Sequence, residues 1–344
     1  MDKFLTLTWF RRLVQLFFFV IMVYGSLFMS TFYSQDKFTQ SLPALSCAYD
    51  KQSGDYCTLI PLQHQMDHTV SGLFTGGEIN IMKSVLPTLI TLGTFVILIV
   101  ILNKAFCGWV CPLGFFQEMI HSLGDKLGFK RFNTLSTSTL KKVRPIKWLM
   151  LAFLVFIFPL LTGIGFLGHE MGDPFCKICP SRILTTLAVG DTSQLYIDNS
   201  STGYMILSII ADLLFGLMIA MALTIKQPFC RICPMLALQA VFKKVGLLRL
   251  VKNGSSSCEK CGLCEKVCPT DIFEIKEAVD KPTNITFADC TLCGMCVEFC
   301  PDDDVMQLQY AGFPVFKSSK DYFKKRNKDQ RNWEKVTWAD VAPK

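Results

Sequence analysis

The hydrophobic pattern of the chain is dominated by four apolar stretches that lack charged side chains, or nearly so. They cover residues 13–33, 84–102, 148–168 and 203–225. A helix of about 20 residues is needed to cross roughly 30 Å of hydrocarbon, and each stretch has about this length. Because lipid offers no hydrogen-bond partners to the backbone, all four are predicted to be transmembrane helices. The first has a long apolar run with no clean small-residue cleavage site after it, so we interpret it as an anchor and not as a signal peptide.

Composition and charge strengthen the prediction of a membrane protein. Hydrophobic residues make up 51% of the chain, which includes 29 Phe, whereas charged residues make up only 18%. Lysine and arginine crowd before the first stretch, between the second and third, and after the fourth. Because basic loops stay in the cytoplasm, we expect a multi-pass protein of the bacterial cytoplasmic membrane with both termini cytoplasmic. This topology and a basic tail at 317–335 explain most of the net charge of +7, so nucleic-acid binding is not expected.

A four-cysteine motif occurs twice near the C-terminal end. Each copy reads Cys-x-x-Cys-x-x-Cys-x-x-x-Cys-Pro, from Cys258 to Pro269 and again from Cys290 to Pro301. Bacterial ferredoxins with two [4Fe–4S] clusters have this pattern, and in them the fourth cysteine of each run ligates the other cluster. The motif therefore predicts two clusters with crossed ligands, one held by Cys258, Cys261, Cys264 and Cys300 and the other by Cys290, Cys293, Cys296 and Cys268.

Other features of this module agree with a ferredoxin. Gly262 and Gly294 are expected to let the backbone turn tightly, so that amide groups point at the cluster sulfurs. A zinc site or a disulfide framework would not need the same run twice with a proline after each copy. The module begins near Ser255, and the predicted topology places it in the cytoplasm, where thiols stay reduced.

Four of the remaining eight cysteines follow the second and fourth apolar stretches. Cys107 and Cys111 lie in Phe-Cys-Gly-Trp-Val-Cys-Pro, and Cys230 and Cys233 lie in Phe-Cys-Arg-Ile-Cys-Pro. Each pair precedes an amphipathic stretch, 113–129 or 235–250, as expected for proline in the first turn of a helix near the membrane interface. A helix N-terminus favours the thiolate form that binds iron. The chain is thus a tandem repeat whose halves could pack about a pseudo-twofold axis and bring these four cysteines to one inner iron–sulfur centre.

The last four cysteines fall in the two loops on the outer side. Cys47 and Cys57 lie between the first two stretches, and Cys176 and Cys179 between the last two. The segment Pro-Phe-Cys-Lys-Ile-Cys-Pro around Cys176 matches the one around Cys230 at six of seven positions. Three interpretations stay open: an outer iron–sulfur centre, a Cys47–Cys57 and a Cys176–Cys179 disulfide in an oxidising compartment, or a redox-active dithiol at Cys176 and Cys179.

Together these motifs resemble a known family. Four spans, a Cys-Gly-Trp-Val-Cys-Pro-Leu motif, a second Cys-Pro motif and a C-terminal two-cluster ferredoxin are similar to the NapH-type membrane quinol dehydrogenase subunits, to the membrane part of NosR and to CcoG-type polyferredoxins. The similarity extends to about Leu308. It implies electron transfer between the quinone pool or a cytoplasmic donor and a redox partner outside the membrane. The chain departs from the NapH pattern in its shorter Cys230–Cys233 spacing and in its additional outer cysteines, and both departures bear on quinol oxidation and on the partner.

A few polar residues are candidates for proton, quinone or metal chemistry. Asp212 is the only acidic residue within a predicted span, a position that is often functional. His64 and His68 stand four residues apart in one outer loop, and His169 and Glu170 are adjacent in the other, although a solvated loop explains them more simply. No histidine falls inside a span, so no membrane haem is expected. The chain has no dinucleotide or P-loop motif, so nicotinamide oxidation and ATP-driven transport have no support.

The sequence therefore predicts a mainly α protein with an α+β ferredoxin domain. We expect a four-helix transmembrane domain of two pseudo-repeated halves (1–252), a two-cluster ferredoxin domain (253–310) and a basic tail (311–344). The predicted function is that of an oxidoreductase electron-transfer subunit that uses two [4Fe–4S] clusters and one or two further clusters, with redox partner proteins on the cytoplasmic or periplasmic side and a place in a larger complex. Three alternatives are kept: a quinone-binding quinol dehydrogenase component that feeds a periplasmic reductase, a factor that reduces a metal such as copper for insertion into another enzyme, and a redox sensor.

Overall fold

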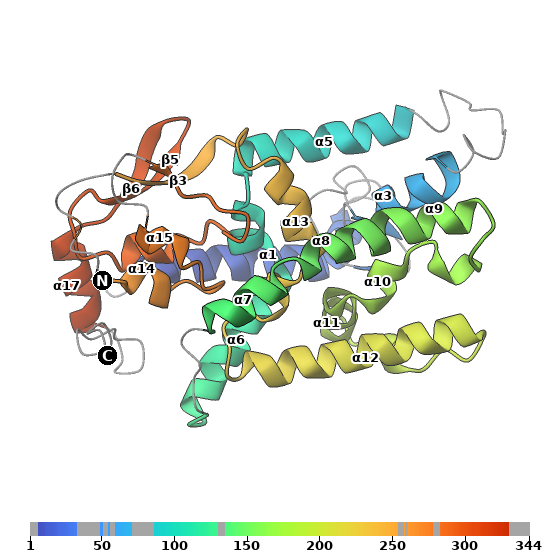
Figure 1. Ribbon diagram of the computed structural model, residues 1–344. Coiled ribbons are helices and arrows are strands. Elements are labelled where there is room, and N and C mark those ends of the chain that lie inside the picture. The colour runs from blue at the N-terminus through green and yellow to red at the C-terminus, as the bar shows by residue number, and fades with distance from the viewer. Residues whose placement is uncertain are drawn as a thin grey trace.

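The molecule has a bundle of long helices at one end and a small α+β domain at the other (Figure 1). The structure is a computed structural model, and it describes residues 6–32, 49–50, 54–55, 59–70, 86–129, 135–253, 258, 261–277 and 283–329. In chain order the bundle contains α1 (Leu7–Phe32), β1 (Tyr49–Asp50), β2 (Gly54–Asp55), α3 (Leu59–His64), η2 (Gln65–Val70), α5 (Leu86–Leu102), η4 (Phe106–Val110), α6 (Pro112–Lys126), α7 (Thr137–Val143), α8 (Ile146–Met150), η5 (Leu151–Ile157), α9 (Phe158–Gly163), η6 (His169–Met171), α10 (Pro174–Ile178), α11 (Pro180–Ala188), η7 (Ser193–Leu195), α12 (Thr202–Ala222), η8 (Phe229–Arg231) and α13 (Pro234–Val241). The α+β domain contains β3 (Leu248–Lys252), α14 (Leu263–Lys266), α15 (Glu274–Glu277), β4 (Thr283–Asn284), α16 (Met295–Glu298), β5 (Met306–Tyr310), β6 (Phe313–Lys317) and α17 (Lys320–Asp329).

The four apolar stretches of the sequence form the long helices. Within the described part of the chain, two helical segments are long and apolar enough to cross a membrane, Thr137–Gly163 and Thr202–Ala222. Helix α1 has 26 residues and α5 has 17, and 17 residues at 1.5 Å each give α5 a length of about 26 Å. The third helical segment ends at Gly163, five residues earlier than predicted, and the chain then turns back into the bundle. A domain of four transmembrane helices therefore stays a prediction, because only two of the described helical segments have the required length and apolar composition.

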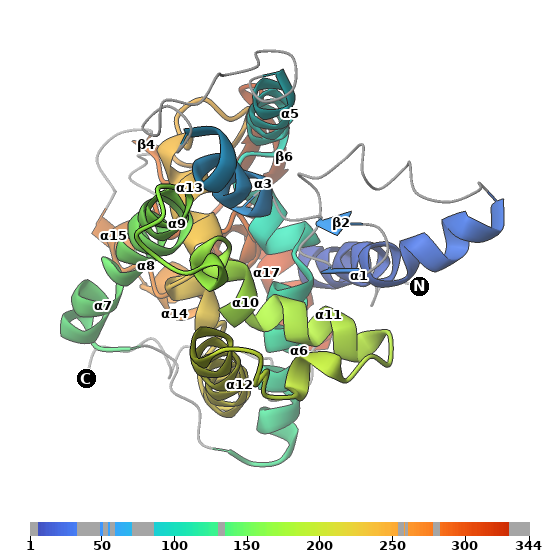
Figure 2. The ribbon, with the colours of Figure 1, turned by 90° about the vertical axis from the view of Figure 1, so that its right-hand side faces the viewer.

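The segment between α9 and α12 does not stay at the far end of the bundle. Helices α10 and α11 fold back between α8–α9 on one side and α12 on the other (Figure 1), and α10 lies near the centre when the molecule is turned by 90° (Figure 2). Both helices pack against α12, and α11 also packs against α6. Phe175, Ile178 and Leu184 are buried in the main hydrophobic core. A segment expected in an outer loop therefore lies deep among the helices.

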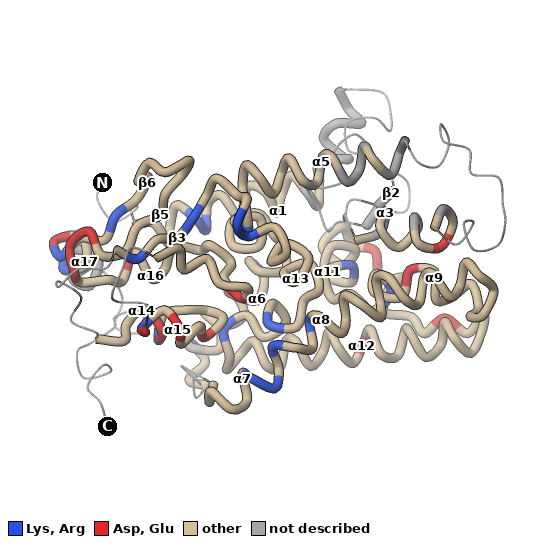
Figure 3. The backbone as a smooth tube through the Cα atoms, turned by 45° about the horizontal axis from the view of Figure 1, so that its top comes forward, with Lys and Arg blue, Asp and Glu red and all other residues tan. Residues whose placement is uncertain are grey.

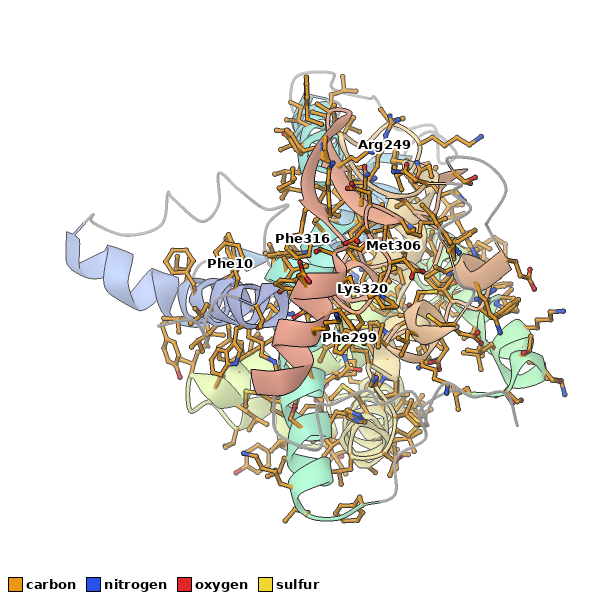
Figure 4. The ribbon with its side chains drawn as sticks, turned by 90° about the vertical axis from the view of Figure 1, so that its left-hand side faces the viewer. Phe10, Arg249, Phe299, Met306, Phe316 and Lys320 are labelled. Carbon is orange, nitrogen blue, oxygen red and sulfur yellow. The ribbon has the colours of Figure 1, made fainter. Side chains whose placement is uncertain are left out.

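The α+β domain is built on an antiparallel sheet of strand order β4-β3-β5-β6. Leu250 on β3 faces Leu308 on β5, and both are buried. Figure 4 views this end of the molecule, with Met306 and Phe316 on the sheet and Phe299 beside helix α17. Phe299 also packs with Phe323 of α17 in a small core. Strand β6 and helix α17 thus continue the domain beyond residue 310, into the segment predicted as a basic tail.

Helix α13 differs from its predicted form. The sequence suggested an amphipathic interfacial helix over 235–250, but the helix ends at Val241 and the chain enters β3 at Leu248. Residues 234–240 are all buried. The helix packs inside the molecule against α8 and η5, so a polar face toward the membrane surface has no room to form.

Candidate iron–sulfur sites

Two short helices start at left-handed glycines in the α+β domain. Gly262 precedes α14 and Gly294 precedes α16, and both have φ of +77°. A side chain is strained in this region of φ and ψ, whereas glycine is not. The tight turn predicted for each cysteine run is therefore present at both positions.

The first cysteine set of this domain lines one cavity. Its four cysteines come from two distant parts of the chain, and Lys252 and Lys276 line the same cavity. The Lys252 ammonium is held by a 2.8 Å hydrogen bond to the carbonyl of Ile275. The fourth cysteine comes from the second motif, as the crossed pattern requires: Cys258, Cys261, Cys264 and Cys300.

The second cysteine set is more deeply buried. Cys268, Cys290, Cys293 and Cys296 are all buried. Burial raises the pKa of the Cys296 thiol well above its ordinary value, and the nearby Cys293, Cys290 and Cys268 raise this pKa further. The backbone N–H of Leu292 also donates to Cys290 Sγ at 3.4 Å. Four sulfurs with an amide donor form a donor set that suits an iron–sulfur cluster.

A third cavity lies among the helices and brings together six cysteines. It has a volume of about 60 Å³, and most of its other lining residues are apolar. The cysteines come from three sequence-distant segments: Cys107 and Cys111, Cys176 and Cys179, and Cys230 and Cys233. The sequence placed Cys176 and Cys179 on the opposite side of the bundle from the other four. Because α10 and α11 fold inward, all six share this cavity.

Three of these cysteines stand at the same kind of backbone corner. Cys111, Cys179 and Cys233 have φ of −60°, −74° and −66° and ψ of 119°, 122° and 123°. Each is followed by a proline that begins a helix, α6, α11 or α13, as the Cys-Pro motifs predicted for α6 and α13. Backbone amides of Met235 and Leu236 bond the Cys233 sulfur and act to lower the pKa of its thiol. Helix N-termini therefore surround the cavity with donors suited to thiolates.

The cavity strongly disfavours uncompensated thiolates. Burial raises the pKa of the thiols of Cys107, Cys230 and Cys233, and the neighbouring cysteines raise these pKa values further. Cys179 is among the groups that act on Cys233, which places the two pairs side by side. Among the residues that the structure describes, no three His, Cys, Asp or Glu side chains converge on a position for a single metal ion. A positively charged iron–sulfur core, which is ligated through several iron atoms, matches a sulfur-only donor set of this kind.

The α+β domain contacts this cavity directly. Gly108, next to Cys107, approaches the backbone of Thr291 and Cys293 so closely that an added Cβ would lie 2.4 Å from the Thr291 carbonyl oxygen. The indole N–H of Trp109 donates a 2.9 Å hydrogen bond to the carbonyl of Leu292. Thr291 itself lines the cavity of the six cysteines. The second ferredoxin cysteine set and the cavity of the six cysteines are therefore joined through adjacent residues.

Basic residues at the end of the helical bundle hold the α+β domain (Figure 3). Arg231 forms a 2.7 Å ion pair with Asp271, and both side chains are almost fully buried. Other contacts join Lys147 to Asp289, Arg144 to Glu274 and Asp289, and Lys104 to the carbonyls of Phe287 and Ala288. Burial lowers the pKa of Lys104 to about 8. The sequence assigned these residues only to membrane topology, and the structure gives them a second role in docking.

The other candidate residues lie apart from the cysteine cavities. His64 and His68 are exposed and stack on each other, with ring centroids 5.7 Å apart. Glu170, next to the exposed His169, accepts a 2.6 Å hydrogen bond from the hydroxyl of Ser201, which caps α12. Asp212 is half-buried on α12, and its Oδ1 has no hydrogen-bond partner in the described part of the chain. Two predicted ligands, Cys47 and Cys57, lie outside the described residues.

Sequence reasoning missed three buried glutamines beside the cysteines, Gln63, Gln117 and Gln239. A signal was available, because each stands six residues after a cysteine. It also missed the contact of Lys104 with the α+β domain. A single lysine near a cysteine motif is too weak a signal to predict such a contact.

Two protein-family models match parts of the chain. A 4Fe-4S binding domain model matches twice, at residues 85–130 and 208–252, and a 4Fe-4S dicluster domain model matches residues 257–303. The double match covers the Cys107–Cys111 and Cys230–Cys233 pairs, the two cysteine motifs of the repeat predicted from the sequence. No solved structure matches this chain.

Several individual relatives are similar to parts of this chain. The putative electron transport protein YccM of Escherichia coli is 30% identical over 54% of this chain and 46% of its own length. Ferredoxin-type protein NapH of Haemophilus influenzae is 28% identical over 54% of this chain and 55% of its own. Regulatory protein NosR of Pseudomonas aeruginosa is 24% identical over 53% of this chain and only 22% of its own. The aligned region thus spans about half or less of each of these relatives. The chain belongs to the NapH- and NosR-like family of ferredoxin-type iron–sulfur electron-transport proteins.

Proposed function

We propose that this protein is a membrane-bound electron-transfer subunit that moves electrons between a cytoplasmic ferredoxin domain and cysteine sites among its helices. The observation that carries the proposal is the contact between the two cysteine sets. Gly108 and Trp109 lie between Cys107 and Cys111 and touch the segment that contains Cys290 and Cys293. Electron transfer needs redox centres held close together in a fixed arrangement, and this contact supplies both conditions.

Four sets of cysteines are the proposed ligands. The cavities and neighbouring sulfurs described above support the crossed ferredoxin sets and an inner set from the two repeat halves. A fourth set would combine the described pair Cys176 and Cys179 with Cys47 and Cys57. When bound, the clusters would supply one-electron redox chemistry, while the residues of the chain hold them, space them and keep water away. The proposed sets are Cys258, Cys261, Cys264 and Cys300; Cys268, Cys290, Cys293 and Cys296; Cys107, Cys111, Cys230 and Cys233; and Cys47, Cys57, Cys176 and Cys179.

Embedding in a membrane is supported by the outward faces of four helical segments. All four expose several large apolar side chains, and extensive exposed apolar surface marks contact with lipid or with other proteins. Because these helical segments are of roughly membrane-spanning length, lipid is the favoured partner. Examples from each segment are Phe10, Leu13 and Phe17 on α1, Leu89 and Ile97 on α5, Leu149, Phe153 and Ile157 on α8 to η5, and Ile206, Leu213 and Leu217 on α12.

The inward fold of α10 and α11 supports a short path through the helical bundle. Sites at opposite faces of a 30 Å core would be far apart for rapid transfer. Cys179 instead lies near Cys233, with both in one cavity. An irregular segment is tolerated at this depth where it is buried in protein. A partner on the outer side would therefore exchange electrons near α10 and α11.

Quinol oxidation is the second candidate function, and one observation favours it. Asp212 is half-buried within α12, and Oδ1 of its carboxylate lacks a hydrogen-bond partner in the described region. Carboxylates inside transmembrane helices often serve proton or quinone chemistry. In this case electrons would enter from the membrane and not from a cytoplasmic donor, and Asp212→Asn would slow reduction by a quinol.

Sealed lipid vesicles offer the test of the principal proposal. The full chain is inserted into vesicles loaded with ferricyanide, and dithionite is added outside. We expect ferricyanide to be reduced faster than in protein-free vesicles, and the increase to vanish in a variant with Cys107→Ser and Cys230→Ser. An equal rate in the variant and in the unchanged protein would overturn the proposed path.

A further inference from the structure

Three buried glutamines repeat one position relative to the cysteines. Gln63 follows Cys57 by six residues, Gln117 follows Cys111 by six, and Gln239 follows Cys233 by six. None of the three exposes more than 2% of its surface. A buried amide must find hydrogen-bond partners, and each of these side chains finds a cysteine sulfur among them.

At the inner site the bonds run reciprocally between the two halves of the repeat. Gln117, from the first half, places Nε2 at 3.6 Å from Cys230 Sγ in the second half. Gln239, from the second half, places its amide oxygen at 3.1 Å from Cys107 Sγ in the first half. Each glutamine thus reaches the first cysteine of the opposite pair, as the pseudo-twofold relation requires.

Gln117 also fixes the backbone beside its cysteine. Its Oε1 accepts a 3.0 Å hydrogen bond from the N–H of Phe229, the residue before Cys230. Its Nε2 donates a second bond, of 3.2 Å, to the carbonyl of Leu113, four residues earlier on α6. The amide is therefore held at both ends, and it orients Cys230 toward the cavity.

Gln63 makes the same three contacts at the other pair. Its Nε2 lies 3.3 Å from Cys176 Sγ and donates at 3.0 Å to the carbonyl of Leu59, four residues earlier. Its Oε1 accepts a 3.2 Å bond from the N–H of Phe175, the residue before Cys176. Leu59 and Leu113 both line the cavity, so the two helices present the same face to it.

We propose that Gln63, Gln117 and Gln239 are positioning residues that hold Cys176, Cys230 and Cys107 and set the reduction potentials of the clusters bound there. The inference rests on the proposed function, because it concerns clusters at the membrane-side cysteines. It deepens that function, because Gln63 marks a second site built to the plan of the first.

The physical basis is the response of a cluster to added charge. Reduction adds an electron, part of whose charge reaches the ligand sulfurs, and an N–H donor at a sulfur stabilises the reduced state. Gln117 and Gln63 already direct Nε2 at their sulfurs. Gln239 faces a thiol with its oxygen, and a half-turn of the amide presents Nε2 to the thiolate of a bound cluster. Loss of any of the three donors should make the potential of its cluster more negative.

One position of the pattern serves as a matched control. Thr185 follows Cys179 by six residues and is 2% exposed. Its hydroxyl donates to the carbonyls of Ser181 and Arg182 within α11 and not to a sulfur. Thr185→Val therefore alters a buried side chain at the same position without removing a donor to a ligand.

The experiment is a redox titration of anaerobically purified full chain, followed by electron paramagnetic resonance, with iron counted in each sample. We expect Gln117→Leu and Gln239→Leu to shift the same membrane-side signal to more negative potential, Gln63→Leu to shift a different signal, and Thr185→Val to shift none. Iron per chain should stay at the unchanged value. Where Gln63→Leu or Gln117→Leu loses iron, the corresponding glutamate variant keeps the acceptor for the N–H of Phe175 or Phe229 and removes the donor to the sulfur, so the potential of that glutamate variant decides.

Two outcomes overturn the inference. If all three glutamine variants retained iron and kept unchanged potentials, the glutamines would contribute only to packing. If Gln63→Leu and Gln117→Leu shifted one and the same signal, Gln63 would not mark a second cluster site. Failure of the proposed function looks different, because the unchanged chain would then carry only about eight irons, the content of two ferredoxin clusters.

Discussion

The indole N–H of Trp109 donates a 2.9 Å hydrogen bond to the backbone carbonyl of Leu292. Trp109 lies between Cys107 and Cys111, and Leu292 lies between Cys290 and Cys293, so one bond joins two cysteine sets from distant parts of the chain. The contact therefore holds the cysteine motif of the helical domain next to one of the ferredoxin motifs. The helical domain presents its cysteines at the surface on which the ferredoxin domain docks.

Close packing at Gly108 predicts a sensitive position. Gly108→Ala would place a Cβ 2.4 Å from the Thr291 carbonyl oxygen, and both contacting groups are backbone, so the α+β domain must move away. We expect a loss of about 1–3 kcal/mol in stability and slower ferricyanide reduction in the vesicle assay. Gly216→Ala is the control, because an added Cβ there meets no atom within 4 Å. Equal rates in the two variants would contradict a tight contact at Gly108.

The buried ion pair between Arg231 and Asp271 predicts a strong effect on docking. Arg231 also donates a 3.0 Å bond to the carbonyl of Pro269, which follows Cys268. Asp271→Asn leaves a buried arginine without its counter-charge, at a cost of about 3–5 kcal/mol. We expect cluster absorbance to be lost at a clearly lower temperature. The double variant Arg231→Met, Asp271→Asn should recover part of the loss, because it removes the unpaired charge, and a double variant as unstable as Asp271→Asn alone would contradict the ion-pair explanation.

The crossed ligand sets predict which substitutions act on the same cluster. Cys300 lines the same cavity as Cys258, Cys261 and Cys264. Cys300→Ala and Cys261→Ala should therefore each abolish the same magnetic resonance signal, with a loss of about four irons. Cys268→Ala should abolish the other ferredoxin signal. If Cys300→Ala removed the signal that Cys293→Ala removes, the crossed assignment would be wrong.

Lys104 predicts a pH-dependent potential. Its buried ammonium donates bonds of 2.6 and 2.8 Å to the carbonyls of Phe287 and Ala288, close to Cys290. A positive charge there stabilises the reduced cluster, and burial lowers the pKa of Lys104 to about 8, so the charge is present at pH 7 and lost as the pH rises above this value. The midpoint potential should fall across that range in the unchanged protein. Lys104→Met should have the lower potential already at pH 7 and no such step, and a step of equal size in the variant would point to another group.

The sequence predicted local chemistry better than spatial relationships. The twofold Cys-Pro repeat and the two glycine turns at Gly262 and Gly294 follow from short-range rules, because backbone conformation at a glycine or before a proline is set by neighbouring residues. The place of Cys176 was missed, since an apolar segment of only a few residues between two spans reads as a loop. Its burial depends on Phe175 and Ile178, which pack in a core assembled from distant helices.

The docking of the two domains could not be predicted from the sequence either. Lys104, Lys147 and Arg231 read as topological signals because the positive-inside rule accounts for basic residues near membranes. Asp289, the partner of Lys147, lies 142 residues further along the chain, and Asp271, the partner of Arg231, belongs to the other domain. Such pairs are set by tertiary packing, which no local pattern encodes.

The most direct test of the central claim is a count of iron and acid-labile sulfide per chain in anaerobically purified protein. The intact chain is compared with two variants, Cys107→Ser with Cys230→Ser and Cys176→Ser with Cys179→Ser. The account predicts about sixteen irons in the intact chain and a loss of about four in each variant. About eight irons in all three proteins would show that only the ferredoxin domain binds clusters, and would contradict an electron path through the helical bundle.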